Sequence, residues 1–87
     1  MDFEYDFRKS GINKIKHGID FKDAQRMWEG EVVEMNSRRE GELRKLVVGK
    51  IDGVYWTAIT TRRGRNIRVI SVRRARGDER SFYENQI

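Results

Sequence analysis

The spacing of hydrophobic residues changes near residue 31, from a helical period to the alternating period of strands. The segments predicted before that point are a short strand at 1–5 and helices at 8–17 and 20–30. In the first helix Ile12 and Ile15 lie on one face, with the lysines largely elsewhere. Gly11 weakens this helix by about 1 kcal/mol relative to alanine, so we expect the helix to depend on packing.

Both predicted helices carry start and stop signals. Asp6 and Asp20 precede the first turns, where an N-cap carboxylate accepts hydrogen bonds from otherwise unpaired backbone N–H groups. Gly18 stands where a residue in the left-handed conformation commonly ends a helix, and Gly30 closes the second helix. The boundaries of the helices are therefore expected close to these four residues.

After residue 31 the pattern predicts four strands and a last helix. Their expected ranges are 31–35, 43–51, 54–62 and 66–73 for the strands and 78–85 for the helix, with Asp78 as its N-cap. Asp52-Gly53 is typical of a two-residue hairpin, and Arg63-Gly64-Arg65 gives a second short connection. The fold predicted for residues 1–87 is a single α+β domain, with an antiparallel sheet of about four strands, two N-terminal helices on one face and a short C-terminal helix.

Residues 66–76 join the most strand-like run of the chain to its densest cluster of cations. The β-branched residues of this run predict a central strand that is covered on both sides, with arginines at its ends. Strict alternation assigns Arg68, Ile70, Val72 and Arg74 to one face, and Ile67, Val69, Ser71 and Arg73 to the other.

Composition narrows the class of protein. The 87 residues are enough for one small domain, and 37% hydrophobic residues are enough for a core. The chain has no cysteine and a single histidine, so we expect no metal site and no cofactor. The absence of a long apolar run, together with an acidic and mixed N-terminal segment, predicts a cytoplasmic protein that does not bind membranes.

The charge of the chain is concentrated near its C-terminal end. The net charge is +5, and residues 62–80 contain eight arginines against two carboxylates. Arginine binds phosphate and carboxylate through paired donors, so nucleic acid is the leading candidate for a partner. Two alternatives are a solubilising surface and an acidic protein partner.

Three segments resemble the BrnT family of bacterial toxins, the toxin half of type II toxin–antitoxin modules. They are Phe-Glu-Tyr-Asp at 3–6, Asn-Lys-Ile-Lys-His-Gly-Ile-Asp-Phe at 13–21 followed by Ala24, and Arg-Val-Ile-Ser-Val-Arg-Arg-Ala at 68–75. The resemblance implies a RelE-like ribonuclease fold and cleavage of mRNA, which blocks translation. It also implies a ribbon-helix-helix antitoxin, BrnA, that covers the toxin, and contact with operator DNA only through that antitoxin.

Cleavage of RNA without a metal ion needs cations that stabilise charge on the phosphorus in the transition state. Five arginines at strand ends are candidates, and we expect several of them to converge at one end of the sheet: Arg62, Arg68, Arg73, Arg74 and Arg76. The resemblance, through its Ile-Ser-x-Arg pattern, favours Arg73 as catalytic. Arg68 is a second catalytic candidate. Arg62, Arg74, Arg76 and Lys16 are then expected to bind RNA phosphates.

Proton transfer needs a second kind of group, and the candidates are His17, Glu79 and Tyr83. Two of these residues can instead have a structural role. His17 can cap the end of its helix, and Tyr83 can anchor the last helix to the sheet. Lys16 points about 100° away from His17 on a helix, so the two are not expected to reach one phosphate.

A rival interpretation is a non-catalytic module that binds RNA or DNA through the same arginines. The two interpretations differ in one measurable property. In EDTA an enzyme produces RNA fragments, whereas a binding module only shifts the electrophoretic mobility of the RNA.

Overall fold

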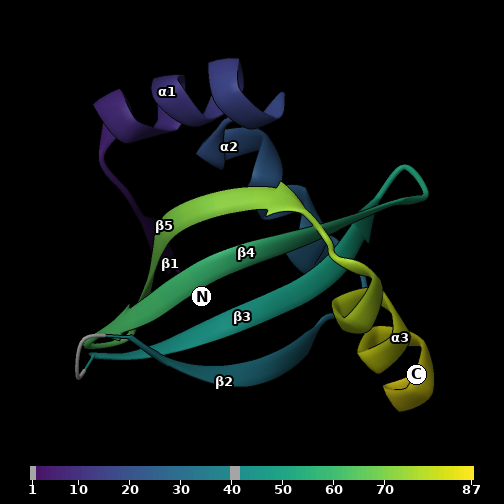
Figure 1. Cartoon of the computed structure of the whole chain (residues 1–87). Coiled ribbons are helices and arrows are strands. Elements are labelled where there is room, and N and C mark those ends of the chain that lie inside the picture. The colour runs from purple at the N-terminus through teal and green to yellow at the C-terminus, as the bar shows by residue number, and fades with distance from the viewer. Residues whose placement is uncertain (1, 40–41) are drawn as a thin grey trace.

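The computed structural model describes residues 2–39 and 42–87, without the side chains of residues 38, 39 and 42. A five-stranded sheet in the order β1-β5-β4-β3-β2 forms its centre (Figure 1). The elements are β1 (Asp2–Glu4), α1 (Phe7–His17), α2 (Phe21–Ala24), the 3₁₀ helix η1 (Gln25–Glu29), β2 (Val33–Arg39), β3 (Glu42–Ile51), β4 (Val54–Arg63), β5 (Asn66–Arg74) and α3 (Gly77–Gln86). The α+β class is as predicted.

The sheet is mixed, which corrects the prediction of an antiparallel sheet of about four strands. β1 pairs in parallel with β5, with Phe3 opposite Ile67, and the other pairs are antiparallel. A parallel partner needs a long crossover, and here it consists of most of the chain. No local pattern in a three-residue strand indicates which distant strand it joins, so the sequence did not predict this pairing.

The helix starts that depend on local hydrogen bonds are confirmed. Asp6 Oδ1 accepts from the N–H groups of Arg8 and Lys9 at 2.8 and 3.0 Å, and Asp20 Oδ1 accepts from Asp23 N at 2.7 Å. Gly18 has φ 85°, as expected at the end of α1. The second predicted helix is α2 followed by the tighter η1.

The last helix begins one residue earlier than predicted, and its N-cap is Arg76 rather than Asp78. The side chain that satisfies the N-cap backbone is Glu79, whose Oε1 accepts from Arg76 N at 2.8 Å. Glu79 therefore closes the first turn of α3 from inside the helix, where a carboxylate also suits the positive end of the helix dipole.

The hydrophobic core lies between one face of the sheet and the segment that contains α2 and η1. Its best-buried members are Phe21, Ala24, Met27, Val47, Ala58 and Val72. α1 and α2 lie on this side of the sheet, whereas α3 lies at one end of it (Figure 1). Trp56 belongs to this core, and Tyr55, its neighbour in β4, stacks edge to face on Tyr83 of α3. Neighbours in a strand point to opposite faces, so Tyr55 lies on the face away from the core. Since α3 packs on Tyr55, it covers the end of that face.

α1 packs through polar residues rather than through Ile12 and Ile15. Asn13 Nδ2 donates to the carbonyls of Val72 and Ile19 at 2.9 and 2.8 Å, and Val72 N donates to Asn13 Oδ1 at 3.2 Å. Both isoleucines are exposed. The helix packs on the protein through a polar face, because the exposed edge of β5 offers backbone groups that need partners.

A register shift in β5 changes which residues share a face. Ser71 lies opposite Ile59 and Val69 lies opposite Thr60, so Ile70 has no residue opposite it. Such a bulge interrupts the alternation of side chains. Val69 and Val72 are both buried in the core, and both Ile70 and Ser71 lie on the other face.

The predicted faces of this strand are therefore correct in part. Arg73 shares a face with Ser71, and Arg74 lies on the opposite face, as expected. Ile70 and Val72 were predicted to share a face, which is wrong, because simple alternation cannot include a bulge. The prediction of a strand covered on both sides is also wrong, since the face with Ile70 and Ser71 lines a pocket.

Within the described part of the chain, none of the helices is long and apolar enough to cross a lipid bilayer.

Candidate functional site

The sheet face opposite the core forms a pocket of about 370 Å³ together with the start of α3. We call it the sheet–α3 pocket. Four strands and one helix contribute its lining, which is Met35, Ser37, Arg44, Leu46, Ile59, Ile70, Ser71, Arg73, Arg76, Asp78 and Glu79. It combines an apolar floor with arginines and carboxylates at its α3 end, so it can hold an anionic ligand that also has a flat apolar part.

A buried ion pair between β5 and α3 fixes the α3 end of this pocket. Arg73 Nη1 and Nη2 donate to Oε1 and Oε2 of Glu79 at 2.7 and 2.8 Å. The two side chains are 18% and 4% exposed. Thr57 Oγ1 and Arg76 N also donate to Glu79 Oε1, at 2.9 and 2.8 Å. Four hydrogen bonds satisfy this carboxylate, as a buried charge requires.

The hydrogen bonds from Arg73 hold the pKa of Glu79 at about 2, below its ordinary value of 4.5. Burial alone would raise this pKa, and the donors Arg76 N and Thr57 Oγ1 add to the lowering effect. The same pairing raises the pKa of Arg73. Glu79 is therefore ionised at neutral pH. Its Oε1 accepts three hydrogen bonds and its Oε2 accepts one from Arg73, so its geometry suits positioning of Arg73 better than proton transfer.

Arg73 keeps one edge of its guanidinium group available. A guanidinium has five N–H donors in a rigid plane. Nη1 uses its two donors on Glu79 and on the carbonyl of Arg74 at 3.3 Å, and Nη2 uses one on Glu79. The remaining two donors, Nε–H and the second Nη2 hydrogen, lie on the same edge and form no hydrogen bond with the described residues. Two parallel donors of this kind match two oxygens of a phosphate.

The five arginines do not converge at one end of the sheet. Arg73 and Arg76 line the pocket together. Arg68 shares its sheet face but lies near the other end of β5, where its Nη1 is 3.6 Å from Glu4 Oε1. Arg62 is exposed beside the turn that connects β4 with β5, opposite Ile67. The expectation that several of the five converge therefore holds for Arg73 and Arg76 but not for Arg62 and Arg68, because strand ends at opposite ends of the sheet look alike in the sequence.

Arg74 lies on the core side of the sheet, with its guanidinium carbon 5.0 Å from the centre of the Trp56 ring. The two residues are direct cross-strand neighbours. This cation–π contact covers the edge of the core, and it leaves Arg74 outside the sheet–α3 pocket.

The remaining candidates lie elsewhere in the fold. None of the described residues that line the pocket belongs to α1, which carries Lys16 and His17. Tyr83 is buried; its hydroxyl donates to the carbonyl of Glu31 at 3.3 Å and its ring packs on Tyr55 at 5.5 Å. Tyr83 therefore anchors α3 to the sheet, which is the structural alternative.

Two polar residues of the pocket were not singled out from the sequence. Ser37 lies in β2, which runs beyond the predicted range of 31–35, and Arg44 lies in β3. A signal for Arg44 existed: the Asp52-Gly53 hairpin fixes the register of β3 on β4 and puts Leu46 opposite Ile59. Counting two residues back from Leu46 then gives Arg44 the same face.

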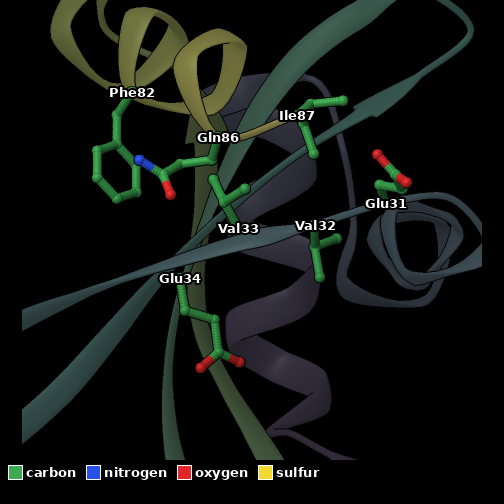
Figure 2. Close-up of a pocket in the computed structure, with 7 residues that line it drawn as sticks. All are labelled: Glu31, Val32, Val33, Glu34, Phe82, Gln86 and Ile87. Atoms are coloured by element: carbon green, nitrogen blue, oxygen red, sulfur yellow. The ribbon is translucent and has the colours of Figure 1, made fainter.

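A second pocket, of about 630 Å³, lies between the start of β2 and the C-terminal end of α3 (Figure 2). Its lining is Glu31, Val32, Val33, Glu34, Phe82, Gln86 and Ile87. Its described lining contains two carboxylates and no cation, so it is unsuited to phosphate despite its greater volume.

Comparison with known families decides among the functions that such a basic pocket could serve. The family model of the ribonuclease toxin BrnT, of the type II toxin–antitoxin system, matches residues 5–79. The chain belongs to the BrnT family. No curated protein sequence matches it. The matched region of this BrnT toxin runs from the end of β1 to the first turn of α3, so it includes both Arg73 and Glu79. The resemblance that the sequence motifs indicated is confirmed, and with it a ribonuclease toxin whose partner is an antitoxin.

Proposed function

We propose that this BrnT toxin is a RelE-like endoribonuclease that cleaves mRNA in the cytoplasm without a metal ion and thereby blocks translation. A ribbon-helix-helix antitoxin of the BrnA kind neutralises it and provides the only contact with operator DNA. The membership of the family supports the ribonuclease activity and the antitoxin. The sheet–α3 pocket supports the location of the reaction.

The observation that carries this proposal is the free edge of Arg73 beside its pairing with Glu79. Glu79 is itself fixed by Thr57 and by the backbone of Arg76, so the guanidinium plane is held before RNA arrives. Donors that are oriented in advance stabilise a transition state more than mobile ones, because they need no reorganisation during the reaction.

In the proposed reaction the 2′-oxygen of a ribose attacks the adjacent phosphorus. The bond from phosphorus to the 5′-oxygen breaks, the 2′-hydroxyl loses its proton, and the leaving oxygen gains one, which yields a cyclic phosphate and a free 5′-hydroxyl. Arg73 stabilises the negative charge that accumulates on the phosphoryl oxygens. Arg76, at the exposed rim, binds a flanking phosphate, and the apolar floor with Ile59 and Ile70 packs against a base.

The test is cleavage of end-labelled RNA by the purified toxin in EDTA, which should yield fragments. Arg73→Lys keeps the positive charge but loses the planar fork, so the single-turnover rate should fall on the order of 100-fold while RNA affinity changes little. Arg74→Ala is the matched control, because the adjacent arginine faces Trp56, and its rate should stay within a few-fold of the wild type.

Two results would contradict the assignment. A shift in the electrophoretic mobility of the RNA without fragments indicates a binding module. Equal losses of rate in Arg73→Lys and Arg74→Ala indicate that the pocket beside Arg73 is not where RNA is cleaved. Circular dichroism of both variants confirms that they are folded.

A further inference from the structure

The outer side of α1 is apolar, although the helix packs on the protein through its polar side. Phe7, Ile12 and Ile15 are 84%, 56% and 89% exposed. Ser10 and Asn13, on the opposite side of the helix, are buried. At about 100° per residue, Phe7 and Ile15 lie on the same side as Gly11, and the exposed Arg8 lies between Ile15 and Ile12. We call the surface formed by Phe7, Gly11, Ile12 and Ile15 the outer face of α1.

The fold does not need this apolar surface. α1 is fixed by the hydrogen bonds of Asn13 to Val72 and Ile19 and by the bond from Phe21 N to Ser10 Oγ at 2.8 Å. Phe7 packs edge to face on Tyr5, with ring centroids 5.5 Å apart, but Phe7, Ile12 and Ile15 do not belong to the core. Exposing large hydrophobic side chains to water costs free energy. An apolar patch of this kind is typical of a surface that another molecule covers.

Positive charges flank the outer face on both sides, and Arg8 adds one within it. On the helical wheel Lys14 lies on one side of it, and Lys9 and Lys16 lie on the other. α1 contains no acidic residue. Complementarity therefore requires a partner in which Asp or Glu borders an apolar seam, and a second copy of this chain would bring lysines against lysines.

Gly11 lies in the middle of the outer face, and a Cβ at this position would meet no atom within 4 Å. Glycine is thus not required by anything inside the protein, and it lowers the stability of the helix. A missing side chain at the centre of an apolar face permits close approach of another backbone, as between packed helices.

We propose that the outer face of α1 is the docking site for an amphipathic helix of the antitoxin, whose apolar seam is bordered by Asp and Glu. The proposal rests on the membership of the toxin–antitoxin family, and it deepens that function by naming the surface that the partner holds. Because no residue of α1 lines the sheet–α3 pocket, antitoxin docking and RNA binding use separate surfaces.

The experiment titrates the full-length toxin with the antitoxin encoded beside it and measures the dissociation constant. Ile15→Glu inserts a negative charge into the apolar face and should weaken binding at least about 100-fold. Lys9→Glu should weaken it about 10-fold, and more strongly at low salt than at high salt. The matched control is Ile87→Gln, which changes a residue that is 60% exposed at the other end of the fold and should leave affinity unchanged.

Gly11→Ala separates docking from folding. Alanine should raise the melting temperature of the free toxin, because helix propensity increases. It should also weaken the affinity for the antitoxin by about 10-fold, because the added methyl group lies at the point of closest approach. A variant that is more stable and binds more weakly cannot owe its loss of affinity to misfolding.

Three outcomes would overturn the proposal. The first is antitoxin affinity that is unchanged in both Ile15→Glu and Gly11→Ala. The second is sedimentation of the free toxin with phosphatidylglycerol vesicles that Ile15→Glu abolishes while antitoxin affinity is unchanged, since the face would then bind a membrane. The third is a toxin dimer that Ile15→Glu dissociates. If the wild-type toxin fails to cleave RNA, the proposed reaction is wrong, but the affinity measurements still decide the docking site.

Discussion

Arg73 and Arg74 are adjacent residues with identical side chains and different surroundings. Arg73 is paired with a buried carboxylate in the sheet–α3 pocket, and Arg74 covers the ring of Trp56. The alternation of strand residues was enough to predict that they lie on opposite faces, and to place Ser71 with Arg73. The partner of Arg73 was not predictable in the same way, because Glu79 reaches it through the first turn of α3.

The pairing of Glu79 makes the stability of the toxin depend on pH. The pKa of Glu79 is lowered from 4.5 to about 2 in the folded protein. Its contribution is therefore complete above pH 4.5 and is lost as pH falls through that value toward 2. We predict that the free energy of unfolding decreases by on the order of 3 kcal/mol over this range. Urea unfolding at a series of pH values measures it.

Glu79→Gln provides the control for this measurement. Glutamine does not titrate, so the part of the slope between pH 4.5 and 2 that belongs to Glu79 should disappear. The variant should also be less stable at pH 7, because the buried charge of Arg73 loses its counter-ion. An unchanged pH profile in the variant would assign the dependence to other carboxylates.

At the level of elements, the sequence predicted what neighbouring residues determine. Asp6 and Asp20 begin their helices, and Gly18 ends one, through contacts within a few residues. Asp52 and Gly53 turn the chain with φ of 51° and 80°. The parallel pairing of β1 with β5 and the register shift at Ile70 depend on contacts between distant segments. The register shift places both Ile70 and Ser71 in the lining of the sheet–α3 pocket.

The attachment of α1 to the edge of β5 depends on a single amide. Asn13→Ala removes the partners of both backbone groups of Val72 and leaves them buried. We predict a loss of stability on the order of 3 kcal/mol and faster hydrogen exchange of the Val72 amide. Lys14→Ala, on the exposed side of the same helix, should change neither quantity. If Asn13→Ala costs as little as Lys14→Ala, the two hydrogen bonds are not what holds the helix.

Two glycines of the same segment should respond to alanine in opposite directions. Gly11 lies within α1 with open space beside it, so Gly11→Ala should raise the free energy of unfolding by about 1 kcal/mol. Gly18 has φ 85°, which strains a residue with a side chain, so Gly18→Ala should lower it by about 1 kcal/mol. Thermal denaturation of the two variants tests both signs at once.

At the level of the whole molecule, charge and shape divide the surface into parts with different partners. Residues 62–80 have a local charge of +6 against +5 for the whole chain, so the remainder is slightly acidic. Two of the acidic residues, Glu31 and Glu34, line the second pocket, at the C-terminal end of α3. The charge distribution was evident from the sequence, but the division of the arginines between the two ends and faces of the sheet required the strand order.

RNA binding should depend strongly on salt because it rests on this local charge. The logarithm of affinity should fall with the logarithm of salt concentration, with a slope of roughly 0.7 for each phosphate contacted on a single strand. Arg76→Ala should reduce the slope by about one such contact, because Arg76 is exposed at the pocket rim. Filter binding at several salt concentrations measures both slopes, and an affinity independent of salt would show that the arginines do not bind phosphate.

The unpaired Ile70 also bears on how the length of this chain can change during evolution. In a regular strand, the loss of one residue turns every later side chain to the opposite face. Without Ile70, Val69 and Ser71 would become adjacent while still lying opposite Thr60 and Ile59, as they do now. A deletion at this point would therefore convert the bulge into a regular strand, and Arg68 and Arg73 would keep their common face. β5 can thus lose one residue here and still place Arg73 in the sheet–α3 pocket.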